Sequence, residues 1–115
     1  MAETERRKSG RVPARIRIIY VHDGDYLTSH SRDLSVDGMF VYTKSPPAVG
    51  ETAELYFSLG PVEDLTVAAR VVWVNRSDME EDAGMGVQFI NPPAACKEAL
   101  LETIKKIAYL STSAT

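Results

Sequence analysis

The chain contains a single cysteine, Cys96, among its 115 residues. One cysteine excludes an internal disulfide framework, and we expect it to pack as a small apolar residue near the start of a helix. The chain also lacks any apolar run approaching the roughly 18 residues that a membrane helix requires. Residues Met1 to Arg11 are polar and charged, without the apolar segment of a signal peptide, so we expect a cytoplasmic location.

The sequence patterns of common enzymes are missing as well. The chain has no GxxxxGK, HExxH, GxSxG or paired-cysteine motif, so we expect no catalytic activity and no cofactor. His22 and His30 have no partner at metal-ligand spacing, which favours surface or hydrogen-bonded roles over a metal site. The net charge of −3 argues against binding to nucleic acid polymers, because such binding relies on a basic face.

Positive charge is nevertheless concentrated near the start of the chain, at Arg6, Arg7, Lys8 and Arg11. A solvated basic arm is one interpretation of this cluster, and capture of a small anion is the other. The composition predicts a flexible arm over residues 1–12. Because Ser9 and Gly10 make this arm small and mobile, the entropy of ordering it is expected to reduce ligand affinity.

Most of the remaining chain is typical of an all-β protein built from short strands and turns. Alternating apolar residues predict a strand at residues 16–20, and Asp23-Gly24 predicts a tight hairpin turn after it. Trp73 and Phe89 lie among aliphatic residues and are expected in the core. The further strands are predicted at residues 26–35, 39–43, 53–59, 65–74 and 86–90.

The pattern changes after Asn91 to one of helical spacing. Asn91 suits a helix cap and Pro92 suits the first turn, so we predict one amphipathic helix over residues 92–110. This helix is expected to lie across one opening or face of the preceding strands, which occupy residues 13–91. The length of the chain fits one domain. The apolar residues at helical spacing are Leu100, Ile104, Ile107 and Ala108.

A second polar cluster, Asp33, Ser35 and Gly38, lies at the end of a strand that is poor in aliphatic residues. Asp33 and Ser35 are two residues apart, so their side chains point to the same face of a strand. An ordinary hairpin corner at Asp37-Gly38 would explain these residues without a ligand. The arginines favour binding instead, because guanidinium groups match the O6/N7 edge of guanine and phosphates, while a carboxylate suits the donors on the opposite edge.

Together, RxxxR at Arg7 and Arg11 and DxSxxG from Asp33 to Gly38 resemble the signature of the PilZ family, whose members bind the bacterial second messenger cyclic di-GMP. The segments GMFV, RVVWV and GMGVQF also look like the usual strands of that family, so the resemblance covers nearly the whole chain. It implies a six-stranded antiparallel β-barrel with a C-terminal α-helix.

The resemblance also implies roles for single residues. One arginine of the RxxxR pair is expected to read a guanine edge, while the other contacts phosphate or stacks on a base and the preceding arginine assists. Asp33 is expected to accept from guanine N1 and N2, Ser35 to contact a phosphate, and Gly38 to allow a close approach or turn. The implied cyclic di-GMP site comprises Arg6, Arg7, Arg11, Asp33, Ser35 and Gly38.

We therefore expect a cyclic di-GMP receptor, not an enzyme, that changes its surface on binding and so regulates a partner protein. The alternative is an interaction adaptor of the same fold, related to motility or pilus assembly, that does not bind the nucleotide. A barrel for single-stranded nucleic acid would need exposed aromatic residues interleaved with basic ones, and here the aromatics are placed in strand interiors. The partner, the number of ligands bound and the formation of a homodimer stay open.

Overall fold

The computed structural model describes residues 10–76 and 82–113, which form one sheet of seven strands and one helix. The elements are β1 (Arg11–Pro13), β2 (Arg17–His22), β3 (Asp25–Ser35), β4 (Gly38–Tyr42), β5 (Thr52–Leu59), β6 (Val62–Asn75), β7 (Gly84–Ile90) and α2 (Ala94–Ser113).

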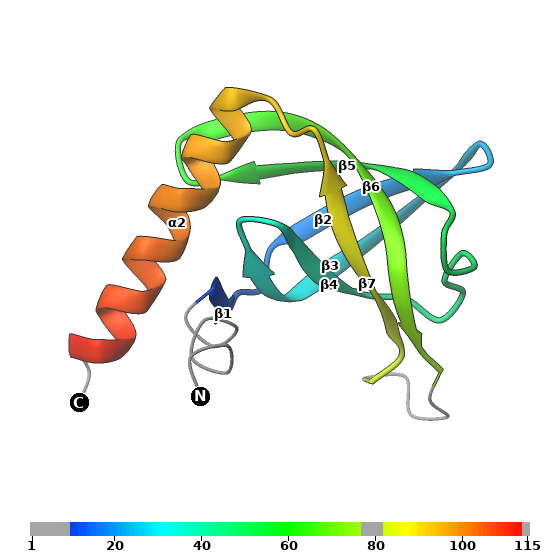
Figure 1. Cartoon of the computed structure of the whole chain (residues 1–115), viewed down its shortest axis with the longest axis horizontal. Helices are drawn as coiled ribbons and strands as arrows, with labels where there is room; N and C mark the ends of the chain where they lie inside the picture. Colours follow the sequence, from blue (N-terminus) through cyan, green and yellow to red (C-terminus); the bar gives the residue numbers. More distant parts are fainter. Residues whose placement is uncertain (1–9, 77–81, 114–115) are drawn as a thin grey trace.

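Six of the strands close into an antiparallel barrel (Figure 1). The order in the sheet is β1-β3-β2-β5-β6-β7-β4, and pairing of β3 with β4 closes the ring. The long strand β3 makes this closure possible, because its first half pairs with β2 while its second half pairs with β4. The prediction of a six-stranded antiparallel barrel with a C-terminal helix is confirmed.

The seventh strand, β1, begins inside the predicted arm, so the predicted arm was too long. We expected a flexible segment through residue 12, but Arg11–Pro13 pairs with the end of β3, where Val12 lies opposite Leu34. Val12 is buried in the core cluster, and burial of its side chain offsets the entropy lost in ordering the segment. The arm itself, residues 1–9, lies outside the described residues.

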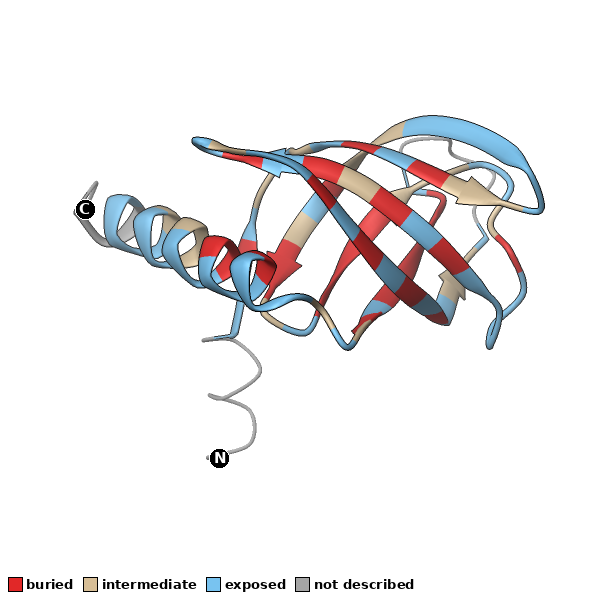
Figure 2. Cartoon of the chain, turned by 90° about the horizontal axis from the view of Figure 1, so that it is seen from above, coloured by how far each residue is buried: buried red, intermediate tan, exposed pale blue. Residues whose placement is uncertain are grey.

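Alternating side chains build the core of the barrel. In β2, Ile18 and Tyr20 are buried while Arg17 and Ile19 are exposed, and β5 and β6 alternate in the same way (Figure 2). The turn after β2 has Asp23 at φ 52° and Gly24 at φ 83°, as predicted from Asp23-Gly24. Strands β2, β5 and β6 therefore keep one face for the barrel interior and one for solvent, whereas β4 and β7 are buried along most of their length.

Helix α2 begins two residues later and ends three residues later than predicted. Pro92 precedes another proline, and the residue before a proline is excluded from the helical region by steric clash. Asn91 has φ 44°, a left-handed turn conformation instead of the extended one of a helix cap. The helix instead starts after Pro93, whose carbonyl oxygen accepts a hydrogen bond from Lys97 N at 3.0 Å.

Only the first turns of α2 bury their apolar residues, namely Cys96, Ala99 and Leu100. The helix packs against β1, β3, β5 and β6, and its second half extends past the barrel (Figures 1 and 2). Cys96 therefore occupies the buried position near the helix start that the sequence predicted, and burial raises the pKa of its thiol. Within the described chain no helix has the length and apolar character needed to cross a membrane.

Candidate ligand-binding site

Two arginines meet one carboxylate on the outer face of the barrel. The Oδ1 atom of Asp33 forms an ion pair with Nη1 of Arg11, which reaches across from β1. The Oδ2 atom accepts a hydrogen bond from Nε of Arg32 at 3.0 Å and forms an ion pair with Nη2 of the same residue, also at 3.0 Å. The carboxylate side chain is 13% exposed and the two arginine side chains are about half exposed, at 46% and 47%. Asp33 thus anchors two guanidinium groups at the surface.

A buried serine places Arg11 beside Asp33. The Ser31 hydroxyl accepts from Ile16 N at 3.0 Å and donates to the carbonyl oxygen of Ala14 at 2.6 Å, which ties the link between β1 and β2 to β3. A further bond from Ala14 N to the Arg32 carbonyl oxygen, 3.1 Å long, continues the pairing. With the bond from Ser31 N to the Ile16 carbonyl oxygen, 2.9 Å long, four hydrogen bonds hold the link, so β1 has little freedom to slide along β3.

Arg32 owes its position to an irregularity in β3. The pairing of β3 with β4 shifts register between Ser31 and Asp33, so Arg32 is the additional residue of a bulge. Bulges re-aim side chains. The guanidinium carbon of Arg32 lies 4.0 Å from the ring centroid of Phe40, which is the β4 residue opposite Asp33. The bulge therefore brings Arg32 to the same outer face as the carboxylate.

The floor of this face is aromatic. The ring centroid of Phe40 lies 5.3 Å from that of Trp73 and 5.4 Å from that of Tyr42. Two glycines of β7 make room for the rings: a Cβ atom would lie 2.3 Å from Phe40 if added at Gly84, and 2.2 Å from Trp73 if added at Gly86. The two glycines of the GMGVQF segment thus permit close packing of Phe40 and Trp73 on β7.

The expectation that Trp73 belongs to the core is wrong. Its side chain is 44% exposed, because the pairing of β6 with β7 shifts register between Val71 and Trp73. Val71 faces the interior, and the bulge then turns Trp73 to the outer face opposite Gly86. Phe89 is buried as expected.

The remaining residues of the second cluster build the turn between β3 and β4. The Ser35 hydroxyl accepts from Asp37 N at 3.2 Å and Gly38 N at 3.1 Å, and donates to the Gly38 carbonyl oxygen at 3.2 Å. Gly38 faces β7, where an added Cβ would lie 2.0 Å from the carbonyl oxygen of Val87. In this structure both residues serve the packing of the barrel, with Ser35 only 8% exposed.

The sequence-predicted site is thus brought together in part. Arg11 and Asp33 are in direct contact, and Ser35 and Gly38 belong to the turn that follows β3. Arg6 and Arg7 lie outside the described residues. Sequence reasoning missed Arg32, Phe40 and the outward position of Trp73. The sequence signal for Arg32 was its position next to Asp33. In a regular strand, however, adjacent side chains point to opposite faces, so that signal would have placed Arg32 on the other face of the sheet.

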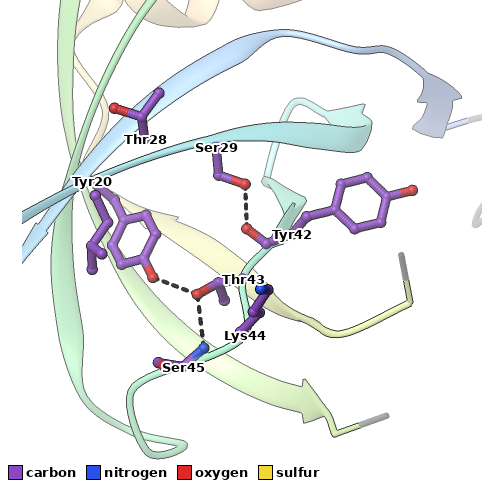
Figure 3. A pocket seen from close by; sticks show the side chains of 8 residues that line it. Tyr20, Thr28, Ser29, Tyr42, Thr43, Lys44 and Ser45 are labelled. Carbon is purple, nitrogen blue, oxygen red and sulfur yellow. Dashed lines mark hydrogen bonds between the residues drawn. The ribbon is translucent and has the colours of Figure 1, made fainter. Parts of the chain in front are cut away.

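A separate hollow of about 420 Å³ lies towards the other end of β3 (Figure 3). Three of its hydroxyl groups bind one another or the backbone: the Tyr20 and Thr43 hydroxyls are 2.6 Å apart, Thr43 Oγ1 accepts from Ser45 N at 3.1 Å, and Ser29 donates to the Tyr42 carbonyl oxygen. These bonds tie β3 to the end of β4 and β2 to the segment that follows β4.

Histidines do not form a metal site in the part of the chain that the structure describes. His22 Nε2 lies 2.9 Å from a Glu51 carboxylate oxygen and 3.3 Å from an Asp23 oxygen. Its Nδ1 atom is 3.2 Å from the carbonyl oxygen of Thr52. Residues 10–76 and 82–113 hold no group of three or more histidine, cysteine, aspartate or glutamate side chains suited to a metal ion.

Comparison with known proteins agrees with this architecture. The family model described as PilZ domain matches residues 5–106, and the chain belongs to this family. The solved structures similar to it include the inhibitor of motility MotI/DgrA of Bacillus subtilis, with 16% identity and a TM-score of 0.73 over 84% of this chain and 48% of that one. This chain therefore spans about half the length of that relative.

Two isolated PilZ domains are also similar. The domain of CeSA from a cellulose-synthesizing bacterium has 19% identity and a TM-score of 0.60, covering 85% of this chain and 97% of that one. The domain of YcgR from Escherichia coli, in a structure with c-di-GMP, has 15% identity and a TM-score of 0.66, covering 90% and 92%. No curated protein matched the sequence. At these identities the likeness establishes the shared fold.

Proposed function

We propose that this PilZ domain is a non-catalytic receptor that binds cyclic di-GMP and acts on a partner protein in the cytoplasm. The observation that carries the proposal is the group formed by Arg11, Asp33 and Arg32 over an aromatic floor. It joins both sequence clusters on one outer face, as expected for a ligand with guanine edges and phosphates.

The chemistry of the group suits a guanine dinucleotide. A guanidinium group donates two parallel hydrogen bonds to guanine O6 and N7, or binds a phosphate. Asp33 Oδ1 receives one donor from Arg11, and a carboxylate oxygen has room for two, so acceptor capacity is left for a guanine N–H. Arg6 and Arg7, close by in sequence, are proposed to add positive charge against the two phosphates.

The proposed signal runs through β1. This strand carries Arg11 on its outer side, buries Val12 in the core and packs against α2. A ligand that draws Arg11 away from Asp33 therefore acts on a strand in direct contact with the helix. We propose that the resulting shift changes the surface that a partner protein recognises.

The adaptor alternative has one observation in its favour. Asp33 Oδ2 already accepts a hydrogen bond from Arg32 and is ion-paired with it, and Ser35 completes the turn, so the polar residues of the cluster have partners without a ligand. An adaptor would use the same arginines and carboxylate to hold β1 in place. Such a protein would bind its partner whether or not the nucleotide is present.

Calorimetric titration with cyclic di-GMP, with cyclic di-AMP as a control, separates the two functions. Arg11→Ala and Asp33→Ala should each weaken cyclic di-GMP binding about tenfold or more, because each removes a guanine or phosphate contact. Arg70→Ala is the matched control, since Arg70 is an exposed arginine on β6, three strands from β3. Absence of binding at a large excess of cyclic di-GMP would reject the receptor and leave the adaptor.

A further inference from the structure

Arg32 has an arrangement that the binding motif does not explain. Its Nε atom donates to Asp33 Oδ2 at 3.0 Å, its Nη2 atom forms an ion pair with the same oxygen at 3.0 Å, and both nitrogens lie in the plane of the guanidinium group. The guanidinium carbon lies 4.0 Å from the centroid of the Phe40 ring, so one face of the group rests against that ring. The guanidinium is therefore held both at its edge and on one face.

The ring beneath it has a fixed position. Phe40 is 1% exposed although it lies outside the interior core cluster. Trp73 and Tyr42 flank the ring at centroid distances of 5.3 and 5.4 Å, and Gly84 allows it to sit close to the backbone of β7. A ring enclosed in this way gives Arg32 a rigid support.

Arg32 is also accessible from solvent, since 47% of its side chain is exposed. An arginine plane stacks on nucleobases as it does on aromatic rings, and stacking is stronger when the plane is positioned in advance. We propose that Arg32 is a stacking platform for one guanine base of the ligand, with Phe40 below the guanidinium and the base above it. This inference rests on the proposed function.

The position and chemistry of Arg32 favour stacking on a base over a purely electrostatic attraction to the ligand. A lysine at position 32 would keep the positive charge beside the phosphates, but it has no plane to stack on the base and no pair of donors in one plane for Asp33. Arg32→Lys thus removes the platform and keeps the charge. Arg32→Ala removes both.

The test is calorimetric titration of the whole chain, the two Arg32 variants and Arg70→Ala with cyclic di-GMP. Thermal melts of the free proteins establish that each variant is folded. We expect Arg32→Lys to weaken binding about tenfold, Arg32→Ala to weaken it at least as much, and Arg70→Ala to bind like the parent. Loss of a stacked base also predicts a smaller ultraviolet hypochromic change of the ligand with Arg32→Lys.

Each other outcome overturns the inference. Parent-like binding by Arg32→Lys together with weak binding by Arg32→Ala would show that Arg32 acts through its charge alone. Parent-like binding by both variants would place the base elsewhere while leaving the receptor function intact. Absence of binding by the parent chain itself would instead reject the proposed function, and the platform with it.

Discussion

Replacement of Gly38 by alanine tests how the turn of the binding motif is built. An added Cβ would lie 2.0 Å from the carbonyl oxygen of Val87, about 1 Å inside the closest contacts that such atoms make. The obstacle is backbone, which cannot rotate away as a side chain would. Strands β4 and β7 must therefore separate where Gly38 pairs with Gln88.

The cost follows from two contributions. Overpacking of this kind typically costs 1–3 kcal/mol, about 2 kcal/mol here. The adjoining hydrogen bond from Phe89 N to the Asp37 carbonyl oxygen, 2.8 Å long, would lengthen at a cost of about 1 kcal/mol. We expect Gly38→Ala to lower the free energy of unfolding by about 3 kcal/mol, which corresponds to a fall of about 12 °C in Tm for a domain of this size.

Urea unfolding followed by circular dichroism measures this loss, with an unchanged slope as the sign that both proteins unfold alike. Gly10→Ala is the control, because a Cβ at Gly10 meets no atom within 4 Å and its φ is not positive. The control should stay within about 0.5 kcal/mol of the parent. The same small change for Gly38→Ala would refute the close approach of β4 to β7.

Two further predictions concern groups with a structural role. Ser35→Ala removes the acceptor of two backbone N–H groups, so it should lower the free energy of unfolding, measured by urea titration, by about 1–2 kcal/mol. Weaker cyclic di-GMP binding with an unchanged unfolding midpoint would instead assign Ser35 to the ligand. The Cys96 thiol is buried, and burial raises its pKa. Alkylation by iodoacetamide at pH 8 should therefore be much slower in the folded protein than in urea, and equal rates would contradict the burial of the thiol.

Local chemistry along the chain was enough to predict much of the fold. The alternation of Ile18 and Tyr20 with exposed neighbours predicts a strand because side chains on a strand point to opposite faces in turn. Asp23-Gly24 predicts its hairpin because those two residues tolerate the positive φ angles that the turn requires. Both signals depend on residues that are close in sequence, so no partner strand is needed to read them.

The candidate site was predictable only where its residues follow such local rules. Asp33 and Ser35 stand two residues apart near a strand end that the sequence predicted, and the basic cluster that contains Arg11 already indicated an anion. That Arg11 and Asp33 bind each other depends on β1 pairing with β3 across more than twenty residues of sequence. A three-residue strand has almost no sequence signal of its own, because tertiary pairing alone stabilises it.

Only the tertiary structure decided which face Arg32 and Trp73 occupy. Each follows a register shift, and a shift of one residue moves a side chain from one face of a sheet to the other. Gly38, Gly84 and Gly86 likewise make room for atoms of strands or rings far away in sequence. The sequence by itself therefore determined the six barrel strands, their turns and the helix, whereas β1 and the contact of Arg32 with Phe40 arise from register between strands, which depends on all the contacts of the closed barrel at once.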